Sequence, residues 1–334
     1  MNLAKENKTP DLPDRCRGAI WGEFVGDAVC LGAHWIYDPN ELKKIFPGGV
    51  AGFETPASGH YHAGKRSGDL THYGDAALLM LQSVAQLGKF SPQDFGARFV
   101  TLFSSEEYHG YRDHATKGTL ENYYPFATQL PNNPYHFQAG ADDDQPATAT
   151  RLAPVVVAHY RDAELIRIVE SATRVCQNNS RAVIYMKCHA LIIKALLTGS
   201  GLEDAFKTAA KAVSNEPEYG QEVIGATETV FSQLGQEVRE VTESFGLSCP
   251  LKSSFPAAMH AALKYQDDPR RAILESANAG GDNAARCAMI GTWLGALQGV
   301  NGIPAEWRAK VNARVEIESC IEKIVRLVGS EPAR

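Results

Sequence analysis

The sequence predicts an all-α protein that folds as a single globular bundle of ten or more helices. Apolar residues recur at three- and four-residue spacing through most of the 334 residues, and the alternating patterns typical of strands are scarce. Hydrophobic residues make up 44% of the chain and charged residues 22%, which is enough apolar surface to fill a core. Polar segments rich in Gly and Asp separate the helical runs.

The individual helices follow from these patterns. Residues 16–33 form the first helix, and its many small residues would let neighbouring helices approach closely. Residues 75–90 form a helix that ends at Gly88, and the next helix, over 91–105, begins with Ser91 as N-cap and Pro92 as first helical residue. We expect further helices over residues 151–160, 163–177, 181–198, 202–214, 238–246, 253–265, 268–279, 284–300 and 316–329. Residues 1–16 are predicted to be a flexible segment, and 17–334 one domain.

Composition excludes several classes of protein. A net charge of −6 without clustered Lys and Arg argues against nucleic-acid or membrane-surface partners. No run approaches the roughly twenty apolar residues that span a bilayer, and no targeting peptide opens the chain. The seven cysteines form neither a CxxC pair nor a Cys/His zinc spacing, which favours a reducing compartment, the cytoplasm. The oligomeric state is left open.

Five Gly- and Asp-rich segments fall between the predicted helices and share Asp, His and Tyr. They cover residues 31–42, 66–75, 110–123, 139–151 and 280–286. Polar residues at helix ends are needed simply to satisfy the free backbone groups there. Sites in helical folds are nevertheless built from converging segments, so we expect these five to meet in one hollow.

The order of these segments resembles the ADP-ribosylglycohydrolase family. "GAIWGEFVGDAVCLGA" at 18–33 resembles the opening helix of the family, and "LTHYGDAALLMLQSVAQL" falls where the family carries TDDT before a helix. "ATRLAPVVVAHY" resembles the MRxAP segment, and the stretch from 278 to 307 resembles the closing GGDTDT helix with its IP..W tail. The resemblance runs from about residue 17 to 310. It implies the all-α glycohydrolase fold and a hydrolase acting on a glycosidic bond.

The chain departs from the family pattern where two magnesium ions would bind. In the family, threonine and aspartates of the TDDT and DTDT motifs hold these ions; here TDDT becomes residues 71–74 and GDTDT becomes residues 281–285. Thr71 and Asp282 remain as ligands, and Asp75 replaces a lost aspartate if the alignment of this segment with TDDT is shifted. Two divalent ions need several carboxylates. We therefore expect one Mg²⁺ at Thr71, Asp75 and Asp282, or none.

Two segments take the place of the lost ligands. "HWIYD" at 34–38 and "ADDDQ" at 141–145 resemble a divergent branch of the family that contains the lens J-crystallins and a selenoprotein. Trp35 and Tyr37 would form an aromatic wall for a planar ring, and His34 would carry acid–base chemistry. The alternative is that the aromatic residues pack under the bundle while His34 caps a helix.

His72 and Tyr73 occupy the former metal corner and would donate hydrogen bonds to a substrate. Alternatively, Asp75 merely caps the following helix and Tyr73 fills the vacated volume. Neither His34 nor His72 is expected to be a zinc ligand, because no tight His/Asp spacing accompanies them.

The acidic run at 142–145 is the densest charge in the chain. It is either a solvated loop or a border of the substrate cleft. In the second case Asp143 and Asp144 would support acid–base catalysis, since burial raises the pKa of a carboxyl, and Asp142 and Gln145 would bind substrate.

Asp282 is the strongest catalytic candidate. Paired glycines permit close backbone approach, and a helix N-terminus favours anions; a plain N-cap is the compatible alternative. Gly281 and Asn283 would bind substrate beside it.

Three functions remain open. The first is a hydrolase cleaving a glycosidic bond in an ADP-ribose-like or nucleoside-type small substrate, or in an ADP-ribosylated one. The second is a metal-free enzyme on another small molecule, which uses His, Tyr and Asp side chains in the same cleft. The third is a non-catalytic, crystallin-like binding or structural protein.

Overall fold

The computed structural model describes residues 9–130 and 133–330, and over these residues it confirms the predicted all-α bundle. The one β pairing among them is an isolated bridge between Ala141 and Gln177. The α-helices are α1 Leu12–Cys30, α2 Pro39–Ile45, α3 His72–Leu87, α4 Pro92–Ser104, α5 His114–Gln129, α6 Ala153–His159, α7 Leu165–Arg174, α8 Ser180–Leu197, α9 Leu202–Val213, α10 Gly220–Ser232, α11 Val238–Phe245, α12 Leu251–Lys264, α13 Pro269–Asn278, α14 Asn283–Gln298, α15 Ala305–Lys310 and α16 Arg314–Ser330. Short 3-10 turns cover Ala149–Arg151 and Val300–Gly302.

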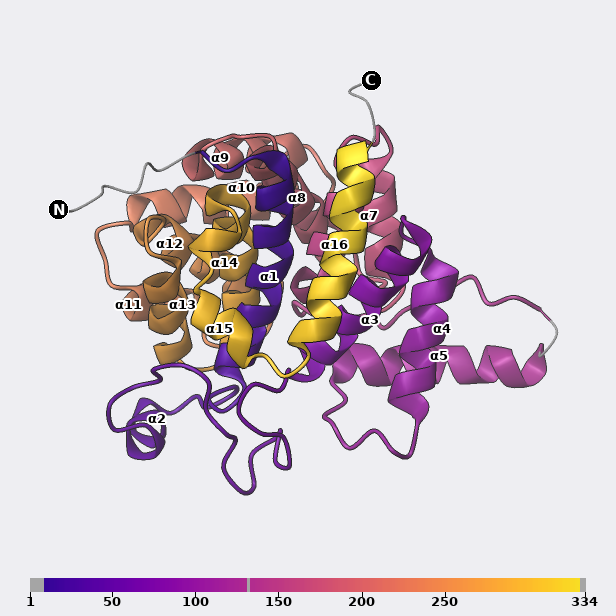
Figure 1. Ribbon diagram of the computed structural model, residues 1–334, viewed down its shortest axis with the longest axis horizontal. Helices are drawn as coiled ribbons and strands as arrows, with labels where there is room; N and C mark the ends of the chain where they lie inside the picture. Colours follow the sequence, from indigo (N-terminus) through magenta and orange to yellow (C-terminus); the bar gives the residue numbers. More distant parts are fainter. Residues whose placement is uncertain (1–8, 131–132, 331–334) are drawn as a thin grey trace.

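Helices α1 and α14 pack side by side in the middle of the bundle (Figure 1) and are buried along most of their length. Glycines line both sides of this contact. A Cβ atom added to Gly22 would lie 1.9 Å from the carbonyl oxygen of Gly291, and one added to Gly18 would lie 2.1 Å from that of Gly295. The expected close approach of small residues in the first helix is therefore confirmed, and it fixes the start of α14 beside the end of α1.

The predicted caps of α3 and α4 are confirmed. Gly88 follows α3 in the left-handed conformation, at φ +70°, and Ser91 accepts a hydrogen bond from the backbone N–H of Asp94. The expectation of a flexible segment over 1–16 is wrong for its last residues. Helix α1 begins at Leu12 with Asp11 as its N-cap, and Cys16 is buried. Residues 1–8 lie outside the described residues.

The prediction that residues 110–123 connect helices is also wrong, because most of them form α5. Asp113 caps this helix by accepting from the backbone N–H of Thr116. Polar composition suggested a loop, but α5 buries Ala115, Thr116, Thr119 and Leu120 against the bundle, and this packing outweighs its weak helix-forming residues. The helices α2, α10 and α15 were not predicted.

The long connection from α1 to α3 crosses one end of the bundle, below the C-terminal end of α1 in Figure 1. It carries His34 and Trp35 directly after α1 and brings His60 and His62 back before α3 begins. This end is where the predicted site residues gather. In the described residues, no helix has both the length and the apolar character needed to cross a membrane.

Candidate active site

The turn before α14 is fixed by backbone contacts that only glycine allows. Gly280 and Gly281 both have positive φ, +79° and +65°, and a Cβ on Gly281 would lie 2.2 Å from the carbonyl oxygen of Leu247. The N–H of Gly281 donates to the carbonyl of Ile36, and the N–H of Trp35 donates to the carbonyl of Gly281, both at 2.9 Å. The segment after α1 and the start of α14 are thereby held together.

Asp282 occupies the first position before α14 and is fully buried. Its Oδ2 accepts a hydrogen bond from the hydroxyl of Tyr73 at 3.4 Å, and its Oδ1 lies 3.7 Å from Nδ1 of His34. Among the described residues Oδ1 has no hydrogen-bond partner. Burial raises the pKa of this carboxyl to about 6, against the opposing charge of Arg286. Asp282 is thus a buried carboxylate that titrates near neutral pH.

Three buried imidazoles stand beside Asp282, and we call His34, His62 and His72 the histidine cluster. Their ring centroids lie 5.4 to 5.9 Å apart, and one nitrogen of each lies within 4.8 Å of one nitrogen of each other ring. Burial, reinforced by His72 and His60, lowers the pKa of His62 to about 2, and burial also lowers that of His34. Both rings are therefore neutral at physiological pH.

Hydrogen bonds orient two of these rings. The amide nitrogen of Asn283 donates to the carbonyls of Ala33 and Ala277, so its oxygen faces Nδ1 of His34 at 3.3 Å. His72 Nε2 lies 3.5 Å from the carboxylate of Asp113. Burial raises the pKa of Asp113, but hydrogen bonds from His72 and Thr116 outweigh it and bring the pKa to about 2.

Trp35 covers the cluster. Its ring stacks on His34 at 4.2 Å and lies 5.1 Å from His72, and Tyr61 and Tyr111 meet it edge-on at 5.1 and 4.8 Å. Trp35 adopts φ +62°, which is unusual for a residue with a side chain. Because Trp35 is half-buried and Tyr61 is exposed, these aromatic residues separate the cluster from solvent.

The acidic run 142–145, which we call the acidic turn, lies apart from these contacts. Asp142 is exposed and accepts from Asn179, and Asp144 pairs with Arg181 at 2.6 Å. Asp143 is buried and accepts from His114 at 2.7 Å, from the Gln145 backbone and from Gln177, both at 3.0 Å. Its charge, with those of Asp282 and Asp113, contributes after burial to the raised pKa of Tyr73. Only Asp143 of this turn therefore faces the centre.

Tyr37 also lies at the margin. It is 43% exposed, and its hydroxyl lies 3.9 Å from Sγ of Cys249. Asp38 caps α2 by accepting from the N–H of Asn40. Trp35 and Tyr37 therefore do not form one wall.

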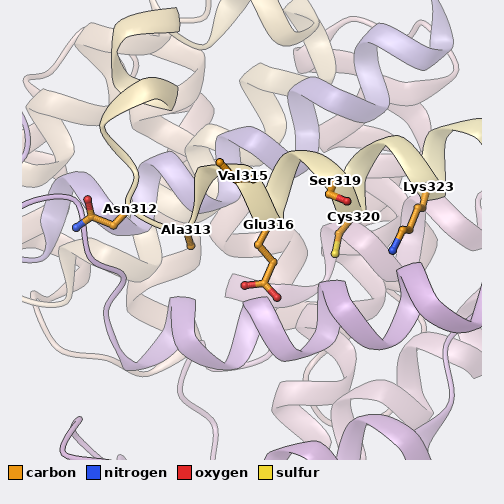
Figure 2. Close-up of a pocket in the computed structure, with 7 residues that line it drawn as sticks. All are labelled: Asn312, Ala313, Val315, Glu316, Ser319, Cys320 and Lys323. Carbon is orange, nitrogen blue, oxygen red and sulfur yellow. The ribbon is translucent and has the colours of Figure 1, made fainter.

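Two surface hollows lie elsewhere on the molecule. The first runs beside α16, where Glu316 points toward the neighbouring α3 (Figure 2) and accepts from Gln82. The second lies beside α2, against Arg239, Glu275 and Asn278. Neither is lined by a predicted site residue, so the centre around Asp282 is a packed cluster rather than either of these hollows.

A comparison with protein-family models matches residues 8–333 to ADP-ribosylglycohydrolase. The chain belongs to the ADP-ribosylglycohydrolase family. It is 21% identical over 322 residues to crystallin J1A of Tripedalia cystophora, covering 94% of this chain and 97% of the crystallin. Crystallin J1B of the same animal is 20% identical over 327 residues, covering 95% and 98%. A solved structure described as an "ADP-ribosylglycohydrolase-related protein complex" matches at a TM-score of 0.68 and 20% identity, covering 95% and 99%; at this identity it establishes the fold.

The magnesium ligands expected from ADP-ribosylglycohydrolases do not fit this chain. The hydroxyl of Thr71 donates to Asp27 and accepts from the N–H of Tyr73. Asp75 is neutralised by Lys65, whose Nζ lies 2.7 Å from Oδ2, and accepts from Tyr108 at 2.8 Å. Asp282 faces imidazoles rather than further carboxylates. A hard cation needs several oxygen ligands, and these oxygens are already bonded or dispersed.

Sequence reasoning missed four residues of the candidate centre: His60, His62, Tyr111 and Asp113. The "HYH" at 60–62 was the available signal, because two histidines one residue apart in a Gly-rich connection are uncommon. Asp113 was missed because it serves as the N-cap of α5, a helix that was not predicted. Asp27, buried in α1, was also missed; it holds the start of α3 by accepting from the backbone N–H of Thr71 at 2.8 Å.

Proposed function

We propose that this protein is a hydrolase that cleaves a glycosidic bond in an ADP-ribose-like or nucleoside-type small substrate. The observation that carries the proposal is the buried Asp282 carboxylate, whose Oδ1 lacks a partner among the described residues while Oδ2 is held by Tyr73. A group of this kind is costly to bury, and such costs are concentrated at working sites. Family membership supports the same reaction class.

The chemistry assigned to Asp282 is to take a proton from a water molecule whose oxygen bonds to the anomeric carbon while the glycosidic bond breaks. The same proton then passes to the departing group. A carboxyl with a pKa of about 6 is mostly ionised at neutral pH and still accepts a proton readily. His34 and Tyr73 hold this carboxylate in place, and Trp35, Tyr61 and Tyr111 offer ring faces and edges to a nucleobase. Asp143 keeps the supporting acid–base role expected for it, whereas Asp144 pairs with Arg181 outside the centre and has no part in it. Substrate entry requires Trp35 and its two tyrosine neighbours to move aside.

The test is release of ADP-ribose from ADP-ribosylated arginine and serine peptides, and of the base from nucleosides, by the purified chain. We expect turnover in the wild type and its loss in Asp282→Asn. Asp142→Asn is the matched control, because that carboxylate is exposed and lies outside the centre. Absence of turnover on every substrate, with Zn²⁺, Mn²⁺, Mg²⁺ or EDTA present, would refute the proposal.

A second proposal is a non-catalytic structural or binding role. It is supported by the burial of His34, His72 and Asp282, each at most 2% exposed, and by the crystallin relatives. A structural role predicts that Asp282→Asn leaves every measurable property except stability unchanged. We also propose the cytoplasm as the compartment, since all seven cysteines are free thiols.

A further inference from the structure

The histidine cluster contains an unusual number of unsatisfied polar atoms. Within the described residues, Nε2 of His34, both ring nitrogens of His62 and Nδ1 of His72 have no hydrogen-bond partner, although each ring is at most 2% exposed. Nε2 of His72 has only the Asp113 carboxylate beside it, at 3.5 Å. Buried polar groups are nearly always paired, and each exception calls for an explanation. Four such atoms in three adjacent rings point to a ligand that bonds nitrogen.

We propose that His34, His62 and His72 bind one first-row transition metal ion of the zinc type. Neutral imidazole is a preferred ligand of Zn²⁺ and a poor one for Mg²⁺. Three histidines with a fourth position left for water is an arrangement found in catalytic zinc sites. The site uses His72 from the altered TDDT segment, but its other ligands, His34 and His62, come from the connection between α1 and α3. Metal binding here stands independently of the proposed hydrolysis.

The distances permit such an ion. An ion equally far from three atoms that lie 4.8 Å apart is about 2.8 Å from each, and a Zn–N bond is about 2.0–2.1 Å long. Each imidazole therefore needs to shift inward by less than about 1 Å.

The atoms around the cluster already orient two of the ligands. The partners of His34 all lie at Nδ1, where the oxygen of Asn283 is at 3.3 Å and the backbone N–H of Ala284 at 3.4 Å, and Nε2 has none. In the tautomer in which Nδ1 donates to Asn283, Nε2 keeps its lone pair for a metal. Asp113 faces His72 Nε2 in the same way and leaves Nδ1 free. A carboxylate or amide oxygen behind each metal-binding histidine is the usual supporting arrangement.

The third ligand is placed by His60. Nε2 of His60 donates to the carbonyl of His34 at 2.7 Å, and its Nδ1 accepts from the backbone N–H of His62 at 3.1 Å. This bridge ties the connection before α3 to the segment after α1. The carboxylates of Asp282 and Asp113, both next to ligand rings, balance the charge of a divalent cation in the buried site.

The experiment uses the full chain, stripped with EDTA and titrated with Co²⁺, whose visible absorption reports nitrogen ligation, and with Zn²⁺ by calorimetry. We expect one ion per chain, displacement of Co²⁺ by Zn²⁺, and no displacement by millimolar Mg²⁺. His62→Gln should abolish the Co²⁺ absorption, and Asp113→Asn should weaken binding by about 10- to 100-fold. His260→Gln is the matched control, because His260 is buried elsewhere and bonds to the carbonyl of Gln233.

Absence of Co²⁺ absorption in the wild type would overturn the proposal, as would equal binding by wild type and His62→Gln. Circular dichroism of the stripped proteins checks that each variant is folded. If His62→Gln does not fold, His72→Gln takes its place with the same expectation. Because the readout is binding, a lack of hydrolase activity leaves this result unaffected.

Discussion

The histidine cluster and the acidic turn are both polar, and both lie near Tyr73, but they differ in whether their polar groups are paired. Asp142, Asp143 and Asp144 each have a partner: Asn179, His114 and Arg181 respectively. In the cluster, four ring nitrogens and Oδ1 of Asp282 have none among the described residues. The carboxylates of the acidic turn, the densest charge in the sequence, are all paired, whereas the unpaired groups lie around Asp282 and the histidine cluster. The lack of hydrogen-bond partners, rather than polarity, therefore distinguishes the candidate site.

The largest expected difference between the two regions is in catalysis. Asp282→Asn keeps the shape of the side chain and removes its capacity to accept a proton, so kcat should fall by at least about 100-fold. Asp142→Asn should change kcat by less than about twofold, because its oxygen only accepts from Asn179 on the surface. Steady-state kinetics on a cleaved substrate measures both. Equal losses in the two variants would remove the distinction between the regions.

For stability we expect the acidic turn, rather than the histidine cluster, to be the more sensitive region. Asp143→Ala leaves the N–H of Gln145 without its acceptor and removes one of three acceptors of the Gln177 amide, which still donates to the carbonyls of Asp143 and Gln145. The free energy of unfolding should therefore fall by about 2 kcal/mol. Urea denaturation followed by circular dichroism measures the change. The control is Asp142→Ala, which should cost less than about 1 kcal/mol. If Asp143→Ala costs no more stability than Asp142→Ala, the hydrogen bonds of the acidic turn do not stabilise the fold.

A buried imidazole outside both regions, that of His189, should make the free energy of unfolding depend on pH. His189 accepts from the indole N–H of Trp293 at 3.0 Å, and burial lowers its pKa to about 3. Between pH 6.5 and 3 the unfolded chain binds a proton at this residue and the folded chain does not, so acid favours unfolding. From pH 7 to 5 this residue should remove about 2 kcal/mol of stability.

His189→Gln should lose that contribution to the pH dependence, which unfolding curves at the two pH values would reveal. The variant keeps an amide oxygen able to accept from Trp293. If wild type and His189→Gln lose the same amount of stability between pH 7 and pH 5, His189 takes up its proton in the folded protein as it does in the unfolded chain.

The smallest effect is expected in the cluster itself. In metal-free protein, His62→Phe removes two unpaired buried nitrogens while keeping a ring of similar size, so the free energy of unfolding should rise by about 1 kcal/mol. Urea denaturation in EDTA measures it. A clear loss of stability would show that His62 makes favourable contacts without a metal. His260→Phe, which breaks a hydrogen bond, should instead destabilise the protein.

Much of the fold was predictable because helix patterns and caps are local. Gly88 and Ser91 end and begin helices through contacts with neighbours in the chain, and small residues in α1 predicted its close packing. Helix α5 was not predictable in this way, because its polar sequence becomes helical through packing on the bundle. The same holds for α10, whose apolar periodicity is broken by Gly and Thr residues.

The site was predicted in part. The paired glycines located Asp282, and the resemblance of the 71–75 segment located His72 and Tyr73, because both depend on short motifs. His62 and Asp113 were not found, since they join the centre only through folding of the connection at 31–71 and capping of α5. The segments that carry His34 and His72 were expected to meet, but nothing in the spacing indicated that His62 would join them. This is why a nitrogen-ligated metal was not expected.

Anomalous X-ray diffraction at the zinc absorption edge, from crystals of the stripped protein soaked in Zn²⁺, tests the central claim most directly. We predict a single strong peak between His34 Nε2, His62 and His72 Nδ1, about 2.0–2.1 Å from each nitrogen. A peak at the carboxylates of residues 142–144 and none between the three rings, or no peak at all, would contradict it.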